Sequence, residues 1–292
     1  MNTLRSLIAS AEDRGRALVL PGAYDALSAR LIEAAGFDAI YVTGAGFANA
    51  SLGVPDIGLV TATEMRDHVA RIVDVVDVPL VVDADTGYGN AINMGRTVRQ
   101  FERAGASALQ IEDQLFPKKC GHFEGKGVIS AREMVQKVHA AVDARQSEDL
   151  LIIARTDARA VSTLDEALER AEMYREAGAD VLFVEAPTSV EEMQIIGQRL
   201  DGPLVANMVE GGKTPLLSAG ELADLGFSVV LFANATLRVA HRAINGLLNE
   251  LAQTGTTNAF LDQMAGWNER QDAVGKSHYD ALERKYSTED PS

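Results

Sequence analysis

The chain has 292 residues, of which 47% are hydrophobic and 24% charged, and its formal net charge is -15. This composition is typical of a globular protein, and the acidic excess argues against nucleic acid or an anionic membrane as a partner. The single cysteine, Cys120, cannot form an intrachain disulfide, which favours the reducing cytoplasm. We also expect no signal peptide, because Glu12, Asp13, Arg14 and Arg16 interrupt what would have to be an apolar core. No apolar run reaches the roughly 18 residues that spanning a membrane requires.

A recurring phrase organises the chain, in which a helix ends at Ala-Gly or Leu-Gly and a short apolar strand follows. The four copies begin at Ala34, Arg103, Glu176 and Asp224. Glycine after a helix adopts the left-handed cap, and an uninterrupted apolar run suits a strand that is buried on both faces. Further candidate strands begin near Ala17, Pro79, Leu150 and Pro203. Together these segments predict a (β/α)8 barrel of parallel strands separated by amphipathic helices.

We expect this barrel to occupy residues 1–253 as one domain, because no proline-rich or low-complexity linker interrupts that range. Residues 254–292 are helical in pattern but do not belong to the repeat. We therefore expect a C-terminal helical extension that packs on a neighbouring subunit and ends in a frayed tail.

Polar residues end nearly every predicted strand, and the carboxyl ends of barrel strands meet at one mouth. In chain order these residues are Thr43, Gly44, Asp83, Asp85, Glu112, Asp113, Arg155, Asp157, Glu185, Asn207 and Asn234. A single carboxylate at a strand end is common, because it caps the next helix. Several carboxylates at one mouth repel one another unless a cation neutralises them, and oxygen ligands favour Mg²⁺. We therefore predict a magnesium site built from Asp83, Asp85 and Glu112, and the spacing leaves open which of them bind through water.

The segment FPKKCGHFEGKG, residues 116–127, follows the strand that ends at Glu112. It places Cys120 among Lys118, Lys119 and His122, and neighbouring cations favour a thiolate. Its glycines permit movement, so we predict a loop that closes over the substrate and carries an acid–base group. A lone cysteine in another setting is more often a small buried apolar residue.

The motifs VVDADTGYGN, LQIEDQ, KKCGH, ARTDA and a strand that ends in VEA resemble the isocitrate lyase and phosphoenolpyruvate mutase superfamily over nearly the whole chain. Within it, KKCGH looks like the loop of members that cleave carbon–carbon bonds, such as 2-methylisocitrate lyase and 2,3-dimethylmalate lyase. The resemblance implies a Mg²⁺-dependent lyase, with Mn²⁺ as a substitute, that cleaves a 2-hydroxy di- or tricarboxylate to a 2-oxo acid such as pyruvate and a second carboxylic acid. It also implies exchange of the eighth helix between subunits and a homotetramer that is a dimer of dimers.

The resemblance also implies roles for the matching residues. Asp85 would bind Mg²⁺ directly, and the outer positions would be those of Asp56, Asp83 and Glu112. The pyruvyl carboxylate would be bound by Thr43, Gly44 and Ala45, and other substrate oxygens by Arg155, Glu185 and Asn207. The closing loop would contribute Lys118, Cys120, Gly121 and His122, with Cys120 as the acid that protonates the leaving carbanion. Tyr41 and Glu112 both remain candidates for the base that deprotonates the 2-hydroxyl group.

Other functions stay open. The stretch FANATLR after the eighth strand resembles the phosphonate-processing branch, and Asn234 then lies where an alkyl group would pack. This favours phosphonomutase chemistry of the carboxyphosphonoenolpyruvate or phosphoenolpyruvate mutase type. Oxaloacetate decarboxylation or hydrolysis is a weaker alternative, because Ala158 follows ARTD where a serine accompanies the hydrolase activity. A non-catalytic barrel would be a scaffold or a ligand-binding subunit.

Overall fold

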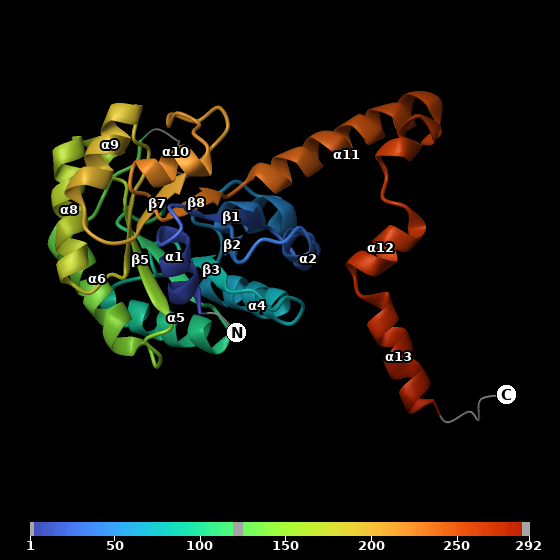
Figure 1. The fold of residues 1–292 in the computed structure, drawn as a ribbon, viewed down its shortest axis with the longest axis horizontal. Helices are drawn as coiled ribbons and strands as arrows, with labels where there is room; N and C mark the ends of the chain where they lie inside the picture. Colours follow the sequence, from blue (N-terminus) through green and yellow to red (C-terminus); the bar gives the residue numbers. More distant parts are fainter. Residues whose placement is uncertain (1–2, 119–124, 288–292) are drawn as a thin grey trace. The chain divides into compact units, whose positions relative to one another are not determined.

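A computed structural model describes residues 3–118 and 125–287 of the chain. Within these ranges, parallel strands form a closed barrel in chain order, with helices between them (Figure 1). Pairing of Leu18 with Val229 and of Pro21 with Phe232 joins the first strand to the last and closes the ring. The predicted (β/α)8 fold is therefore confirmed. The strands are β1 (Leu18–Ala23), β2 (Ile40–Val42), β3 (Leu80–Asp83), β4 (Ala108–Glu112), β5 (Leu151–Thr156), β6 (Val181–Val184), β7 (Leu204–Asn207) and β8 (Val229–Phe232).

The helices that connect these strands begin at side chains that cap them. Ser130 accepts a hydrogen bond from the N–H of Glu133, and Thr61 and Glu64 form a reciprocal capping box. The helices of the barrel are α1 (Leu4–Glu12), α2 (Ala26–Ala34), α3 (Gly44–Phe47), the π-helix η1 (Ala48–Leu52), α4 (Ala62–Val73), α5 (Ala91–Arg103), α6 (Ala131–Ala144), α7 (Ala158–Val161), α8 (Leu164–Glu176), α9 (Val190–Arg199) and α10 (Ala219–Asp224).

The four glycines of the repeated phrase adopt the backbone conformation that the sequence predicts. Gly36, Gly105, Gly178 and Gly226 follow α2, α5, α8 and α10, with φ between +86° and +101°. Side chains other than glycine resist this left-handed region. Each glycine therefore ends a helix and turns the chain into the next strand.

Alternation of side chains along the strands creates two apolar layers. On β5, Leu151 and Ile153 belong to the cluster inside the barrel, whereas Ile152 and Ala154 pack against the surrounding helices. Because the strand period is two residues, the next inward position is Arg155. Counting in the same way along the strand from inward-facing apolar residues of β3, β4, β6 and β7, the inward positions at the strand ends are Asp83, Glu112, Glu185 and Asn207. The barrel core thus ends in a ring of polar side chains at the carboxyl ends of the strands.

The chain divides into two compact units, Met1–Leu237 and Arg238–Ser292. The second unit contains most of α11 (Ala235–Thr254), which lies before the predicted domain boundary at residue 254. The predicted extension after that boundary is helical, with the 3-10 helix η2 (Asn258–Gln263), α12 (Trp267–Ala273) and α13 (Lys276–Tyr286). These four helices bury none of their described residues. No helix in the described part of the chain is both long and apolar enough to cross a membrane.

Candidate active site

A small cavity of about 70 Å³ lies at the carboxyl ends of the barrel strands. It brings together residues from every strand of the barrel except β1. Eleven of the predicted site residues line it: Tyr41, Thr43, Ala45, Asp56, Asp83, Glu112, Lys118, Arg155, Glu185, Asn207 and Asn234. Asp85 is not part of the lining, but its Oδ1 contacts Lys118. Gly44 is adjacent in space, since a Cβ there would lie 2.9 Å from Asp83 Oδ2. Cys120, Gly121 and His122 lie outside the described residues.

The ammonium group of Lys118 lies among the predicted metal-binding carboxylates. Its Nζ is 2.5 Å from Asp56 Oδ1 and 2.7 Å from Asp85 Oδ1, and the Lys118 side chain is 5% exposed. Burial alone would lower the pKa of Lys118, but Asp85, Asp83, Glu112 and Asp56 hold that pKa well above its ordinary value. The lysine is therefore a cation that neutralises part of this cluster.

Asp85 occupies an unusual backbone position at the end of β3. Its φ is +48°, and its N–H donates to Asp83 Oδ1 at 3.2 Å, which ties the Asp83 carboxylate to the backbone of Asp85. Burial, and then the charges of Asp83 and Asp56, raise the pKa of Asp85 to about 7 against the opposing effect of Lys118. One ammonium group does not compensate the negative charge gathered here.

Arg155 joins the carboxylates on the other side of the cavity. Its Nε and Nη2 donate to Asp157 Oδ2 and Oδ1 at 2.9 and 3.0 Å, which is a bidentate pair. Its Nε is also 3.4 Å from Glu112 Oε2, and its Nη1 is 3.7 Å from Glu185 Oε2. The guanidinium lies 5.3 Å from the centre of the Phe183 ring. Arg155 is therefore held by fixed partners on several sides, with Nη1 turned away from Asp157.

The two candidate bases differ in their electrostatic surroundings. Burial, followed by the charge of Asp83, raises the pKa of Tyr41 well above its ordinary value, so the phenol stays protonated. Burial also raises the pKa of Glu112 well above its ordinary value, and Arg155 opposes this shift. Glu112 Oε1 is buried and has no hydrogen-bond partner among the described residues. Of the two, Glu112 is the better suited to accept a proton.

The donor set fits a hard cation that is bound largely through water. Among the described residues, no three His, Cys, Asp or Glu side chains approach closely enough to form a direct metal-ligand group. Mg²⁺ needs only one or two direct carboxylates and retains several water molecules, so this arrangement is compatible with it. The unpartnered Glu112 Oε1 and the excess negative charge around Asp85 both favour a divalent cation. The metal site itself remains a prediction.

Four apolar residues of the cavity were not anticipated from the sequence. Phe183, Val209, Leu231 and Ala233 form part of its lining. Phe183 and Leu231 are inward-facing residues of β6 and β8, so their strand parity carried a signal. Another part of the cavity wall is polar: the Thr43 hydroxyl donates to Asn234 Oδ1 at 3.2 Å, and this bond links the ends of β2 and β8. The cavity thus offers both charged and apolar surfaces.

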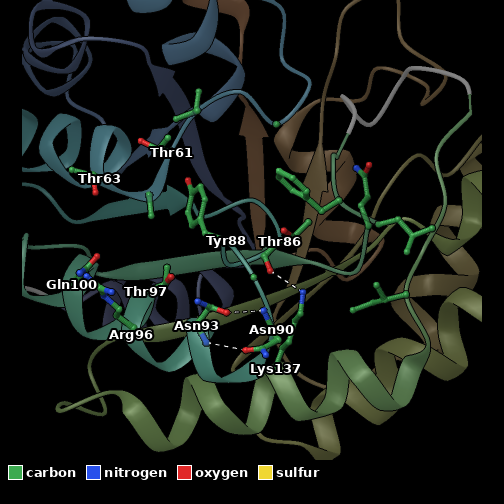
Figure 2. Close-up of a pocket in the computed structure, with 18 of the residues that line it drawn as sticks. Thr61, Thr63, Thr86, Tyr88, Asn90, Asn93, Arg96, Thr97, Gln100 and Lys137 are labelled. Carbon is green, nitrogen blue, oxygen red and sulfur yellow. Dashed lines mark hydrogen bonds between the residues drawn. The ribbon is translucent and has the colours of Figure 1, made fainter.

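A larger cavity of about 760 Å³ is lined in part by Thr86, Tyr88 and Asn90 of the loop that follows Asp85 (Figure 2). It is lined by residues of α4, α5, α6 and their loops, and it contains none of the carboxylates that end the strands. Lys137 on α6 donates to the carbonyl oxygen of Thr86 at 3.1 Å, as the dashed line in Figure 2 shows. We place the chemistry in the smaller cavity, because that is where acidic and basic side chains converge.

The sequence of this chain is similar to those of known carbon–carbon lyases and phosphomutases. Residues 8–252 match the family model of phosphoenolpyruvate phosphomutase. A 2,3-dimethylmalate lyase from Eubacterium barkeri is 46% identical over 271 residues, which cover 93% of this chain and 94% of that protein. A 2-methylisocitrate lyase from Aeropyrum pernix is 46% identical over 270 residues, which cover 92% of this chain and 87% of that protein.

Solved structures agree with this relationship. The crystal structure of a 2,3-dimethylmalate lyase, described as a PEP mutase/isocitrate lyase superfamily member, matches with a TM-score of 0.91 and 38% identity. The match covers 98% of this chain and 96% of that one. A phosphonopyruvate hydrolase in complex with oxalate and Mg²⁺ matches with a TM-score of 0.86 and 30% identity, over 98% of this chain and 99% of that one.

Proposed function

Because this chain belongs to the phosphoenolpyruvate mutase and isocitrate lyase superfamily, we propose that it is a Mg²⁺-dependent carbon–carbon lyase. Its substrate is a 2-hydroxy di- or tricarboxylate of the 2,3-dimethylmalate or 2-methylisocitrate type. The products are a 2-oxo acid such as pyruvate and a second carboxylic acid. The observation that carries this proposal is the convergence of Asp83, Glu112 and Arg155 on one cavity, beside Lys118, whose ammonium group lies 2.7 Å from Asp85 Oδ1.

Mg²⁺ is the cation that this donor set suits, and Mn²⁺ is a substitute of similar ligand preference. Asp85 is the proposed direct ligand, and Asp56, Asp83 and Glu112 are proposed to act through water. When bound, the metal would supply Lewis-acid polarisation of the substrate's oxygens. Burial, and then the charges of Asp83 and Asp56, raise the pKa of Asp85 to about 7, and a divalent cation would oppose this shift.

The remaining polar residues are proposed to bind and orient the substrate. Arg155 suits a carboxylate, because a guanidinium edge forms paired charge-assisted hydrogen bonds. Glu185 and Asn207 lie beside it in the cavity wall. The Thr43 hydroxyl and the backbone N–H groups of Gly44 and Ala45, at the start of α3, are proposed to hold the carboxylate of the 2-oxo acid portion.

The proposed reaction moves two protons at defined atoms. Glu112 accepts the proton of the 2-hydroxyl group, and the O–H electron pair forms the carbonyl group of the 2-oxo acid. The electron pair of the C2–C3 bond passes to the leaving acid, whose carbanion takes a proton from Cys120. Cys120 lies outside the described residues, so its role is proposed from the KKCGH motif alone. Lys118 and His122 are proposed to assist in the same loop.

The substrate's alkyl group is proposed to contact the apolar lining of Phe183, Val209 and Leu231. The cavity of about 70 Å³ is far smaller than the roughly 300 Å³ that typifies sites for small ligands. Lys118 fills part of this space, because its ammonium lies between Asp56 and Asp85. We therefore propose that the lysine side chain withdraws when metal and substrate bind.

A second candidate is phosphonomutase chemistry, for which the presence of Asn234 in the cavity wall is the specific observation. Phosphorus NMR of phosphonate substrates incubated with the protein distinguishes it from the lyase. Loss of the carbon–phosphorus signal would favour the mutase, whereas unchanged phosphonate together with 2-oxo acid release from hydroxy acids would favour the lyase.

We propose that the chain assembles with copies of itself, as a homotetramer in the cytoplasm. Helix α11 has exposed apolar residues at Val239, Ile244, Leu248 and Leu251, and the helices after it also bury nothing. Apolar surface of this extent is typical of an interface. Sedimentation of the full chain tests the assembly, and Leu248→Glu should shift it toward smaller species. The location rests on the single cysteine.

The test of the activity is a screen of alkylated malates and isocitrates with the purified protein and Mg²⁺, in which 2-oxo acid release is measured. We expect one of the alkylated substrates to be cleaved and Cys120→Ser to abolish turnover. Full activity of Cys120→Ser would remove the cysteine from the mechanism. Absence of 2-oxo acid from every substrate would overturn the lyase.

A further inference from the structure

Lys126 lies just after the residues of the KKCGH motif and contacts the carboxylate behind Arg155. Its Nζ is 2.8 Å from Asp157 Oδ1, and the two side chains are 2% and 0% exposed. Burying an ammonium group is costly unless a partner of opposite charge compensates it. Asp157 therefore supplies charge that compensates the buried ammonium group of Lys126.

The same oxygen of Asp157 is shared between Lys126 and Arg155. Arg155 Nη2 donates to Asp157 Oδ1 at 3.0 Å, while Arg155 Nε donates to Oδ2 at 2.9 Å. Burial alone would raise the pKa of Asp157, but Arg155 and Lys126 together lower it. The carboxylate thus stays ionised between two cations, and it is the only group of the three that carries negative charge.

The backbone of Asp157 is also held. Its N–H donates to Asp113 Oδ1 at 2.9 Å, and Asp113 Oδ2 accepts from the Thr156 and Tyr174 hydroxyls at 2.8 and 2.7 Å. Asp113 is fully buried and ties β5 to α8. With the main chain fixed in this way, the direction of the Asp157 carboxylate depends on the two cations that it accepts from.

We propose that Lys126 is a positioning residue that orients Arg155 through Asp157; this rests on the proposed function, in which Arg155 binds a substrate carboxylate. Glu112 and Glu185 already oppose the positive charge of Arg155 on its other sides. Without Lys126, the carboxylate of Asp157 would add its full charge to theirs and would be free to pivot with Arg155. The Nη1 edge of Arg155, which Asp157 does not contact, would then lose both its direction and its attraction for an anion.

The experiment measures the affinity of the full-length protein for oxalate in the presence of Mg²⁺ by calorimetry, and KM and kcat for the cleaved hydroxy acid. The variants are Lys126→Met, Lys126→Gln, Lys126→Arg, Asp157→Asn and the double variant Lys126→Met with Asp157→Asn. Arg14→Met is the matched control, because it removes a positive charge from an exposed residue before β1, at the opposite end of the barrel. Lys126→Gln is a second neutral variant should Lys126→Met fail to fold.

We expect Lys126→Met to weaken oxalate binding roughly tenfold or more and to raise KM more than it lowers kcat. Lys126→Arg should restore affinity to within about threefold, because it keeps the charge. In the Asp157→Asn background, loss of Lys126 should cost little more, since Lys126 acts through Asp157. A neutral variant with parental oxalate affinity and KM would overturn the positioning role, as would losses that simply multiply in the double variant. Failure of the parent protein to bind oxalate would instead overturn the anion site, and with it both proposals.

Discussion

The ammonium nitrogen of Lys118 lies 2.7 Å from Asp85 Oδ1, where an ion bound to Asp85 would also have to lie. A protein cation and a proposed metal ion therefore share the same carboxylate. Burial raises the pKa of Asp85 to about 7 even with Lys118 beside it, so the cluster retains a demand for further positive charge. The consequence is a competition between the lysine and Mg²⁺ for Asp85 and Asp56.

Replacing Lys118 with methionine should strengthen Mg²⁺ binding while it lowers turnover. The substitution removes the competing charge and preserves most of the apolar stem, so we expect the Kd for Mg²⁺ to fall about tenfold. Calorimetric titration of Mg²⁺ into the chelator-treated protein measures this directly. An unchanged or weaker Kd would show that Lys118 does not compete with the metal. Arg14→Met, far from the carboxylates, should leave the Kd unchanged.

Arg155→Lys should lose most activity although the positive charge is kept. A lysine ammonium cannot form the bidentate pair with Asp157 and still present a second edge to a substrate carboxylate. We expect kcat/KM to fall about a hundredfold or more. The matched control is Arg159→Lys, since Arg159 lies on α7 and pairs with Glu192 instead. If both variants lost activity equally, the loss could not be assigned to the cavity.

Lys137→Met should weaken metal binding, although Lys137 lies outside the smaller cavity that holds the proposed metal site. Lys137 donates to the Thr86 carbonyl oxygen, one residue after the left-handed Asp85, and Figure 2 shows this bond beside the larger cavity. Without the bond, the buried carbonyl loses its partner and the turn that aims Asp85 loosens, with an expected cost of about 1–2 kcal/mol in unfolding free energy. Mg²⁺ titration and urea unfolding check the two effects. Reduced stability with unchanged Mg²⁺ affinity would separate Lys137 from the metal site.

His68 should make the protein less stable as the pH falls. Burial, followed by the charge of Arg71, lowers its pKa from 6.5 to about 4, and its ring lies 4.3 Å from that of Phe47. Between these two pH values the unfolded chain binds a proton at His68 and the folded chain does not. The contribution of His68 to the free energy of unfolding is therefore fully present above pH 6.5 and is lost as the pH falls from there toward 4. The contribution of His68 between pH 7 and pH 5 should be about 2 kcal/mol.

Urea unfolding of the parent and of His68→Phe at these two pH values measures that contribution as a difference. The phenylalanine variant should lose less stability on acidification, because other titrating groups are common to both proteins. Equal losses in the two proteins would mean that His68 is not the group responsible.

The repeated glycines and apolar strands were enough to predict the barrel. Gly36, Gly105, Gly178 and Gly226 occupy the left-handed positions that the sequence indicated, because only local backbone geometry decides them. Seven of the eleven residues predicted at the strand ends line one cavity, since parallel strands place their carboxyl ends together, whereas Gly44, Asp85, Asp113 and Asp157 are not part of its lining.

Side-chain partners that are distant in sequence could not be predicted in this way. The pairing of Lys126 with Asp157 and of Lys118 with Asp56 depends on how loops cross the barrel mouth, which no periodicity records. The apolar wall of Phe183 and Leu231 was missed because the strands were predicted from uninterrupted apolar runs, which do not tell inward-facing from outward-facing residues, and site residues were sought only among polar strand ends. The sequence predicted that Asp83, Asp85 and Glu112 lie together, but it did not predict that the ammonium group of Lys118 lies between Asp56 and Asp85.

Proton NMR of 2,3-dimethylmalate incubated with chelator-treated full-length protein, before and after Mg²⁺ is added, tests Mg²⁺-dependent carbon–carbon cleavage most directly. We expect no change before Mg²⁺, and afterwards equal amounts of pyruvate and propionate, the two acids that cleavage of the C2–C3 bond must give. The same experiment with 2-methylisocitrate would give pyruvate and succinate. Intact substrate in both reactions, or cleavage that proceeds equally without the metal, would contradict the Mg²⁺-dependent lyase.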